Sequence, residues 1–297
     1  MIPYKPIPIL FHIGNYPVYT EFLAMILAFI IYFWLVIRHL KKEKVMIKGS
    51  DIYDFVLILI ITSLLGGRLW HFVAEGQSLN DFISLNGQGI TSFGMLLGGV
   101  VGVLFFIWVK RKDLKKENRF STVEFAKVLD VLALYAGIWI FIYRILGCTL
   151  NGDVIGTPTN IPWAFVWPDG VARHPTSVYL GLAGLLIFGL LWFFFKKEKT
   201  EHHKFGKRFD GEVGLWFLVL YIFLRILIEF TRMDTNFGIL QTSLIVIFLL
   251  SIFTMISCYD LLNDIKKMSN EDQKKHQDKF YKSLKVLRYV KKIFKIK

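Results

Sequence analysis

The sequence predicts an all-α polytopic membrane protein with about seven transmembrane helices. Of its 297 residues, 54% are hydrophobic, and the mean hydropathy of +0.49 is high for a soluble domain of this length. Several uncharged stretches are long enough to cross a bilayer, and basic residues gather in alternate loops. The net charge of +13 does not indicate a nucleic-acid partner, because the Lys and Arg residues cluster in a few loops and the C-terminal tail.

Seven apolar segments are expected to form the spans. In chain order they are Tyr19–Ile37, Ile52–Val73, Ile90–Val109, Val123–Leu146, Ser177–Phe195, Val213–Phe230 and Leu240–Leu262. The third is the weakest, because its glycines thin the apolar side chains, and it is expected either to cross as a helix or to dip into the membrane beside protein. Those glycines also favour close approach of neighbouring helices. They are Gly87, Gly89, Gly94, Gly98, Gly99 and Gly102.

The loops fall into two classes by charge, and this predicts the orientation. Five, six and six Lys or Arg residues lie in the loops Arg38–Lys48, Lys110–Arg119 and Lys196–Arg208. The alternate loop Ala74–Asn86 carries none, and Asn151–Pro175 carries only Arg173. Cytoplasmic loops hold the excess of Lys and Arg, so the N-terminus is predicted outside and the C-terminus in the cytoplasm.

The two ends of the chain carry predictions of their own. Met1–Pro17 lacks the short apolar core and cleavage site of a signal peptide. The tail Asp264–Lys297 holds 12 basic and 4 acidic residues, and is expected to be a cationic amphipathic helix on anionic membrane lipids or a solvated, partly disordered tail. The predicted domains are a transmembrane domain, residues 1–263, and a basic cytoplasmic tail, residues 264–297. Two cysteines, Cys148 and Cys258, predict neither a disulfide framework nor a metal site.

A buried charge pair is the first candidate for function. Arg225 lies inside the run Val213–Phe230, with Glu229 one helical turn later and Tyr221 one turn earlier on a similar face. A charge at that depth is costly and indicates a functional site by default. An Arg225–Glu229 ion pair is the structural alternative, and it would lower the cost of burial without explaining the charge.

Two more arginines lie near the ends of other spans. Arg68 follows Gly66-Gly67 and precedes Trp70-His71, where a snorkelling interfacial anchor is the alternative. Arg144 leads into Asn151-Gly152-Asp153 and then Gly156, a predicted turn whose backbone N–H groups suit an anion. An ordinary helix-ending loop is the alternative there. Three arginines in or near the spans predict a site for a negatively charged lipid head group.

Three other titratable residues are candidates for function. The aromatic outer loop Pro162–Gly170 leads into Arg173-His174-Pro175, where His174 would titrate near neutral pH or serve in capping and packing. Glu21 in the first span and Asp130 in the fourth are intramembrane acids, and so default functional candidates.

Taken in order, these segments resemble the phosphatidylglycerol–prolipoprotein diacylglyceryl transferase family, from about Pro17 to Gly238. Gly67-Arg68 is similar to the family's Gly-x-Arg near the end of the second span, and Asp130, Ala133 and Arg144 keep the family's spacing into its signature segment. Seven spans with the N-terminus outside are also the family arrangement. The other matches are Asn151-Gly152-Asp153 with Gly156, Arg173-His174-Pro175-Thr176 with Tyr179, and Tyr221, Arg225 and Glu229-Phe230 with Arg232.

The sequence departs from the family pattern at several positions. Phe93 stands where the family usually has an essential His, and Glu21 falls near the place of a Tyr. Tyr143 replaces the Gly before the signature Arg144, one extra residue lies between Arg144 and Asn151, and Cys148 stands where many members have Asn. By this pattern the chain resembles a divergent member of the family.

The resemblance implies a transferase of the bacterial cytoplasmic (inner) membrane. It would move the diacylglyceryl group of phosphatidylglycerol to the lipobox cysteine thiol in the signal peptide of a preprolipoprotein, releasing glycerol-1-phosphate, with no cofactor or metal. Arg144 and Arg225 are expected to clamp the phosphate, with Arg68 supporting them. The remaining lipid-binding residues are expected to be Asn151, Asp153, Gly156, Tyr221 and Glu229. The base is open: His71 or His174 would take the thiol proton, or the clamp alone would lower the thiol pKa.

Two other functions fit parts of the pattern. A lipid-binding paralogue would keep the fold without catalysis. A transporter fits less well, because the intramembrane charges cluster toward the outer half and the halves show no corresponding pair of broken helices.

Overall fold

The computed structural model describes residues 1–14, 16–43, 49–75, 122–152, 154–195, 209–233 and 239–267, with helical residues 94–95, 97–99, 101–103, 105–106 and 108–109. The chain forms two compact units. The first comprises Met1–Arg119, Tyr135–Leu185 and Thr231–Asp234; the second comprises Phe120–Leu134, Leu186–Phe230 and Thr235–Lys297. Phe93, Asp153 and the tail beyond Lys267 lie outside the described residues.

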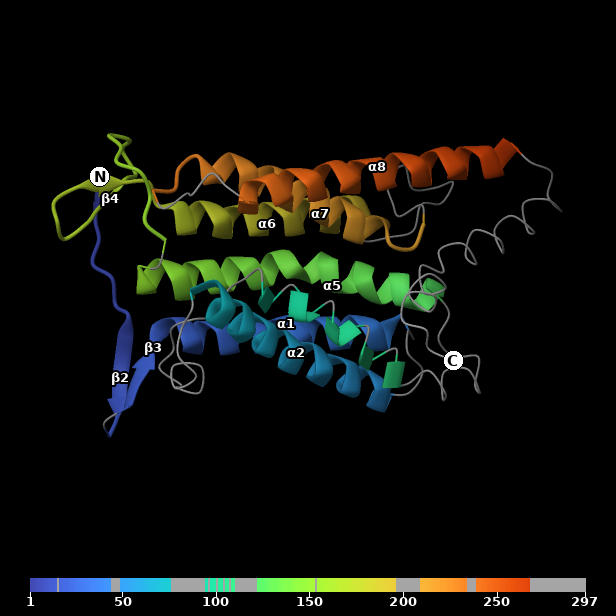
Figure 1. Cartoon of the computed structure of the whole chain (residues 1–297), viewed down its shortest axis with the longest axis horizontal. Coiled ribbons are helices and arrows are strands. Elements are labelled where there is room, and N and C mark those ends of the chain that lie inside the picture. The colour runs from blue at the N-terminus through green and yellow to red at the C-terminus, as the bar shows by residue number, and fades with distance from the viewer. Residues whose placement is uncertain are drawn as a thin grey trace. The chain divides into compact units, whose positions relative to one another are not determined.

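Long helices account for most of the described residues (Figure 1). They are α1 (Thr20–Lys42), α2 (Gly49–Glu75), α5 (Thr122–Ile142), α6 (Thr176–Phe195), α7 (Glu212–Glu229) and α8 (Ile239–Lys267), and α5 continues as a π-helix, η1 (Tyr143–Thr149). These helices overlap six of the seven apolar segments in the sequence.

Within the described residues, four helices are long and apolar enough to cross a membrane: α1, Tyr53–Val73 of α2, Ala126–Thr149 and α6. α7 carries Glu212, Arg225 and Glu229, and in α8 the apolar stretch is shorter, Ile245–Asp260. The structure therefore supports a multi-pass helical membrane protein, while the count of seven and the orientation stay predictions.

Short strands are a feature that the all-α prediction did not include. β1 (Ile2–Pro3) pairs in parallel with β4 (Phe165–Val166), which pairs antiparallel with β5 (Ala172–Arg173). β2 (Ile9–Ile13) and β3 (Tyr16–Tyr19) form an antiparallel hairpin before α1. The prolines at positions 3, 6, 8 and 17 disfavour a helix over this N-terminal stretch, and extended segments then satisfy their backbone groups by pairing.

In the first unit, α1 packs against η1. Met25 and Ala28 of α1 form a buried cluster with Tyr143 and Cys148 of η1, and Trp139 stacks on the Tyr143 ring at a centroid distance of 5.4 Å. The small Ala28, fully buried, lets the aromatic ring approach the helix. This packing holds the end of α5 and its π-helical extension in place.

Glycines join α2 to the third predicted span. A Cβ on Gly66 would lie 2.6 Å from Gly98 Cα and 2.5 Å from the Gly94 carbonyl oxygen, and the side chains of Phe55 and Phe106 pack edge to face at 5.0 Å. Only residues without a side chain fit such an approach. The predicted close packing of this glycine-rich segment is confirmed at its described residues.

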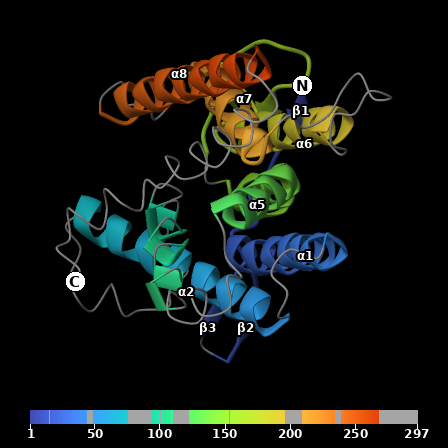
Figure 2. The same cartoon turned by 90° about the vertical axis from the view of Figure 1, so that its right-hand side faces the viewer.

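The second unit pairs α7 with α8, which lie side by side in Figures 1 and 2. Gly211 precedes α7 with φ of 98°, a left-handed conformation that favours glycine. Asp130, 4% exposed on α5, accepts hydrogen bonds from the backbone N–H groups of Gly211 at 2.8 Å and Gly214 at 3.1 Å. The carboxylate of Asp130 thus caps the start of α7 from a neighbouring helix. The buried Glu212 accepts a hydrogen bond from the hydroxyl of Tyr259 on α8.

Candidate functional site

The helix that carries Arg144 widens just before the predicted turn. α5 ends at Ile142, and the next seven residues, Tyr143–Thr149, form the π-helix η1. The Thr149 hydroxyl donates to the Arg144 carbonyl at 2.8 Å, five residues back. A π-turn holds more residues than an α-turn, so η1 is able to accommodate the extra residue that the family resemblance implies between Arg144 and Asn151.

Arg144 is half-buried among side chains of its own helix. Its Nη1 lies 3.4 Å from Cys148 Sγ, and its guanidinium carbon lies 5.6 Å from the centroid of the Tyr143 ring. Cys148 is 1% exposed, so this side of the arginine is shielded from solvent. A fixed cation at the end of a span suits an anionic head group.

Two of the departures from the family pattern meet beside Arg144. The Tyr143 hydroxyl donates to Glu21 Oε1, and the side-chain amide of Asn151 donates to Glu21 Oε2 at 3.1 Å. Glu21 lies in the first turn of α1 and is half-buried. The predicted site residue Asn151 and the intramembrane acid Glu21 therefore belong to one hydrogen-bonded cluster.

The N-terminal segment covers the turn after η1. The Tyr4 hydroxyl donates to the Thr149 carbonyl, and the backbone N–H of Ile7 donates to the Leu150 carbonyl at 2.6 Å. Burial raises the pKa of Tyr4 to about 12. Gly152 has φ of 76°, and a Cβ there would lie 2.8 Å from Pro6 Cβ. The predicted Asn-Gly turn is thus present, and both its conformation and its close contact require glycine.

Gly156 lies in an extended strip between two other parts of the first unit. It forms a bridge with Arg232, and the N–H of Thr157 donates to the Thr231 carbonyl at 2.8 Å. On the other side, the His174 N–H donates to the Thr157 carbonyl at 3.0 Å. A Cβ on Gly156 would collide with the His174 carbonyl group, so this position accepts only glycine.

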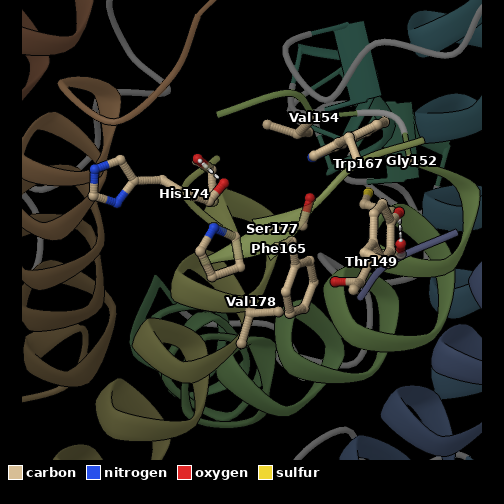
Figure 3. A pocket seen from close by; sticks show the side chains of 12 residues that line it. Thr149, Gly152, Val154, Phe165, Trp167, His174, Ser177 and Val178 are labelled. Carbon is tan, nitrogen blue, oxygen red and sulfur yellow. Dashed lines mark hydrogen bonds between the residues drawn. The ribbon is translucent and has the colours of Figure 1, made fainter. Parts of the chain in front are cut away.

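A narrow pocket opens between η1, β4 and the start of α6, with room for about one water molecule (Figure 3). Ser177, 5% exposed, lines this pocket, and its Oγ has no hydrogen-bond partner among the described residues. The other lining residues are Tyr4, Cys148, Gly152, Val154, Trp167, His174, Pro175, Thr176 and Val178.

His174 occupies the edge of this pocket. In Figure 3 its ring projects away from Ser177 and Thr149, and its Nδ1 lies 3.3 Å from the Tyr179 hydroxyl. On the same outer loop, Arg173 donates to both carboxylate oxygens of Asp169, at 2.8 and 2.6 Å. The hydrogen bonds from Arg173, and one from the Val171 N–H, lower the pKa of Asp169 to about 2.

The second unit holds the other predicted arginine of the clamp. Arg225 and Glu229 on α7 are 9% and 6% exposed, and their side chains form an ion pair. The structural alternative considered from the sequence is therefore present, and it holds the guanidinium in one place. Tyr221 is half-buried and stacks on Phe217 at 5.7 Å.

The predicted residues divide between the two units. Arg68 and His71 are half-buried near the end of α2, in the first unit with Arg144, Asn151, Gly156 and His174. Tyr221, Arg225 and Glu229 belong to the second. The convergence of Arg144 and Arg225 on one phosphate stays a prediction, and the predicted role of Asp153 falls outside the described residues.

Two contributors escaped the sequence analysis. Tyr4 reaches η1 from a position 145 residues earlier in the chain, and no local pattern signals such a contact. Ser177 was not among the predicted site residues, but its buried hydroxyl lines the pocket.

Comparison with known proteins supports the resemblance. A family model for prolipoprotein diacylglyceryl transferase matches residues 8–261. A phosphatidylglycerol–prolipoprotein diacylglyceryl transferase of Bordetella bronchiseptica is 32% identical over 259 residues, covering 82% of this chain and 90% of the relative. Proteins of the same name from Finegoldia magna and Campylobacter hominis are 29% and 25% identical, over 75% and 92% of this chain and 82% and 95% of their own lengths. The chain belongs to the prolipoprotein diacylglyceryl transferase family.

Proposed function

We propose that this chain transfers the diacylglyceryl group of phosphatidylglycerol to the lipobox cysteine thiol of preprolipoproteins. The observation that carries the proposal is the family match over residues 8–261, which includes every arginine of the predicted clamp. The relatives named above act, by their names, on phosphatidylglycerol and a prolipoprotein.

The chemistry requires a cation where negative charge develops. A thiolate attacks the glycerol carbon that carries the phosphate, the carbon–oxygen bond breaks, and glycerol-1-phosphate leaves with an additional negative charge. Arg144 and Arg225 bind this phosphate, and Arg68 supports them, since a guanidinium stays charged and offers two parallel N–H donors. Asn151, Tyr221 and Glu229 orient the clamp, and the ion pair with Glu229 keeps Arg225 from turning away. Asp153 and Gly156 complete the lipid-binding segment.

The proposed setting is the bacterial cytoplasmic membrane, with seven spans and the N-terminus outside. The charge difference between the loops Asn151–Pro175 and Lys196–Arg208 supports this orientation. Labelling of intact cells with a membrane-impermeant maleimide tests it. Thr159→Cys is expected to be labelled from outside and Lys199→Cys only after lysis, and the reverse pattern would invert the topology.

Mass spectrometry of a lipobox peptide tests the activity. Purified full-length chain is incubated with phosphatidylglycerol vesicles and the peptide, and the product is expected to gain one diacylglyceryl group on its cysteine. Arg144→Ala and Arg225→Ala are each expected to lower the rate by about 10²–10³-fold, the loss that accompanies removal of one charge-stabilising donor. Arg144→Lys keeps the positive charge but lacks the two parallel N–H donors of a guanidinium, and it is expected to retain part of the rate that Arg144→Ala loses.

Arg38→Gln is the matched control, since Arg38 packs over Trp34 near the other end of α1. Its rate is expected to stay at the level of the unmodified chain. Full lipidation by both alanine variants would rule out the clamp. Binding of phosphatidylglycerol without product would identify a lipid-binding paralogue, and flux through reconstituted vesicles without product would identify a transporter.

A further inference from the structure

A carboxylate lies next to the proposed phosphate clamp, and the mechanism above does not use it. Glu21 accepts one hydrogen bond from the Tyr143 hydroxyl and one from the Asn151 amide, the latter at 3.1 Å. Tyr143 immediately precedes Arg144, and the Arg144 guanidinium lies 5.6 Å from the centre of the Tyr143 ring. One aromatic ring thus borders both the cation and the carboxylate.

Glu21 lies in the first turn of α1, at the end of the helix where the backbone N–H groups point. The Tyr143 hydroxyl and the Asn151 amide add two hydrogen-bond donors from another part of the chain. A carboxylate has two oxygen atoms and about four acceptor sites, which is the chemistry of a group that can take a proton.

Two segments contact η1, the element that carries Tyr143: α1 and the N-terminal segment. η1 contributes Tyr143, the cation Arg144 and the buried thiol Cys148. Tyr19 precedes α1 directly, and Tyr4 of the N-terminal segment contacts η1 at the Thr149 carbonyl. In this set Glu21 is the carboxylate and Arg144 is the cation. Thiol alkylation needs both kinds of group, a base for the thiol proton and a cation for the leaving phosphate.

Resting on the proposed function, we propose that Glu21 is the general base that takes the proton of the lipobox cysteine. The S–H bond breaks, the proton moves to a Glu21 oxygen, and the thiolate forms a bond to the glycerol carbon as the carbon–oxygen bond to phosphate breaks. The proton then passes from Glu21 to the departing glycerol phosphate or to water, which returns the carboxylate. The thiol attacks the glycerol carbon from the side opposite the leaving oxygen. The base therefore lies next to the thiol, whereas the arginine clamp lies at the phosphate.

The departures from the family pattern agree with this assignment. The sequence has Phe93 at the family's His position, so an imidazole is missing from that place. Glu21 falls near the place of a Tyr in the family pattern and Tyr143 stands at the place of a Gly, and these two residues contact each other. His174, one of the two histidines considered from the sequence, lies beside Tyr179 with its ring turned from the pocket.

The test compares pH–rate profiles of the full-length chain with phosphatidylglycerol vesicles and a lipobox peptide. At about pH 7, Glu21→Gln is expected to lower the rate by about 10²–10⁴-fold, the usual contribution of a general base. The deficit is expected to shrink as the pH approaches the thiol pKa of about 8.5, because the peptide then ionises without help. Formate is expected to restore part of the rate of Glu21→Ala, since it supplies the missing carboxylate. Glu43→Gln is the control, because Glu43 is exposed at the opposite end of α1.

A structural role for Glu21 predicts a different result. A constant deficit of Glu21→Gln at every pH, with no rescue of Glu21→Ala by formate, would overturn the assignment and leave the transferase activity standing. Unchanged activity of Glu21→Gln would overturn it as well. If the unmodified chain forms no product at any pH, the proposed function fails and the base assignment falls with it. If Glu21→Gln folds poorly, the formate experiment and the activity of Glu21→Asp decide whether Glu21 is the base. Partial activity is expected for Glu21→Asp.

Discussion

The carboxylate of Asp130 is expected to determine whether α7, the helix that bears Arg225, forms in its proper place. Asp130 is 4% exposed and accepts hydrogen bonds from the backbone N–H groups of Gly211 and Gly214, at 2.8 and 3.1 Å. A hydrogen bond to a charged group contributes about 1.5–3 kcal/mol, so Asp130→Ala is expected to lower the free energy of unfolding by about 3–6 kcal/mol. Asp130→Asn keeps one acceptor oxygen and is expected to lose about half of that amount.

The effect is expected to reach the proposed site. Arg225 lies fourteen residues beyond Gly211, about 21 Å along the helix, so a loosened first turn changes the direction of the whole element. Transferase activity of Asp130→Asn is therefore expected to fall together with stability, whereas a residue of the site itself would lower activity alone.

The measurement is unfolding of the purified chain by SDS in mixed micelles, followed by circular dichroism. Asp260→Asn is the matched control, an exposed acid on α8 in the same unit. If Asp130→Ala costs no more stability than Asp260→Asn, the capping role of Asp130 is wrong.

Three further predictions concern packing and pH. Gly184→Ala is expected to lower the free energy of unfolding by about 1–3 kcal/mol, because its Cβ would lie 2.7 Å from a backbone oxygen of α5. Gly189→Ala, whose Cβ would have nothing within 4 Å, is expected to leave that free energy unchanged or to raise it by up to about 1 kcal/mol. Equal thermal stability of the two variants would contradict this. The pKa of Asp169 is about 2, below its ordinary 3.8, so its pairing with Arg173 is complete above about pH 4 and lost as the pH falls through about 2. Protection of the outer loop from hydrogen exchange is expected to fall over the same pH range, and Asp169→Asn is expected to remove this pH dependence. The pKa of Tyr4 is raised to about 12, so the stability that its neutral hydroxyl contributes is complete below about pH 10 and lost as the pH rises through about 12. Tyr4→Phe is expected to lower the free energy of unfolding by about 1 kcal/mol and to remove this part of the alkaline pH dependence of stability.

The predictable part of the fold was the part set by local hydropathy. α1, α2 and α6 coincide closely with apolar segments, because a span must be apolar along its own length. The strands could not be predicted in the same way, since β1 pairs with β4 more than 160 residues later and each strand has only two residues. Their pairing depends on where the helices bring the chain.

The candidate site shows the same division. Arg144, Asn151 and Arg225 were predicted from charge, depth and turn chemistry, all of which are visible in short stretches of sequence. The contact of Glu21 with Tyr143 spans 122 positions and was not visible, although both residues had been noted as departures from the family pattern. Asp130 was predicted to be functional because buried acids are rare, but the structure gives its carboxylate backbone partners and hence a structural role.

The wide turn of η1 bears on how such a sequence can change without losing its fold. A one-codon insertion in an ordinary α-helix rotates everything downstream by about 100°, which would carry Asn151 away from α1. When the added residue is taken up within Tyr143–Thr149, the flanking segments keep their facing, so the mutation is survivable. Deleting one residue from this stretch is therefore expected to return the turn to ordinary α-helical pitch while the segments on either side keep their facing.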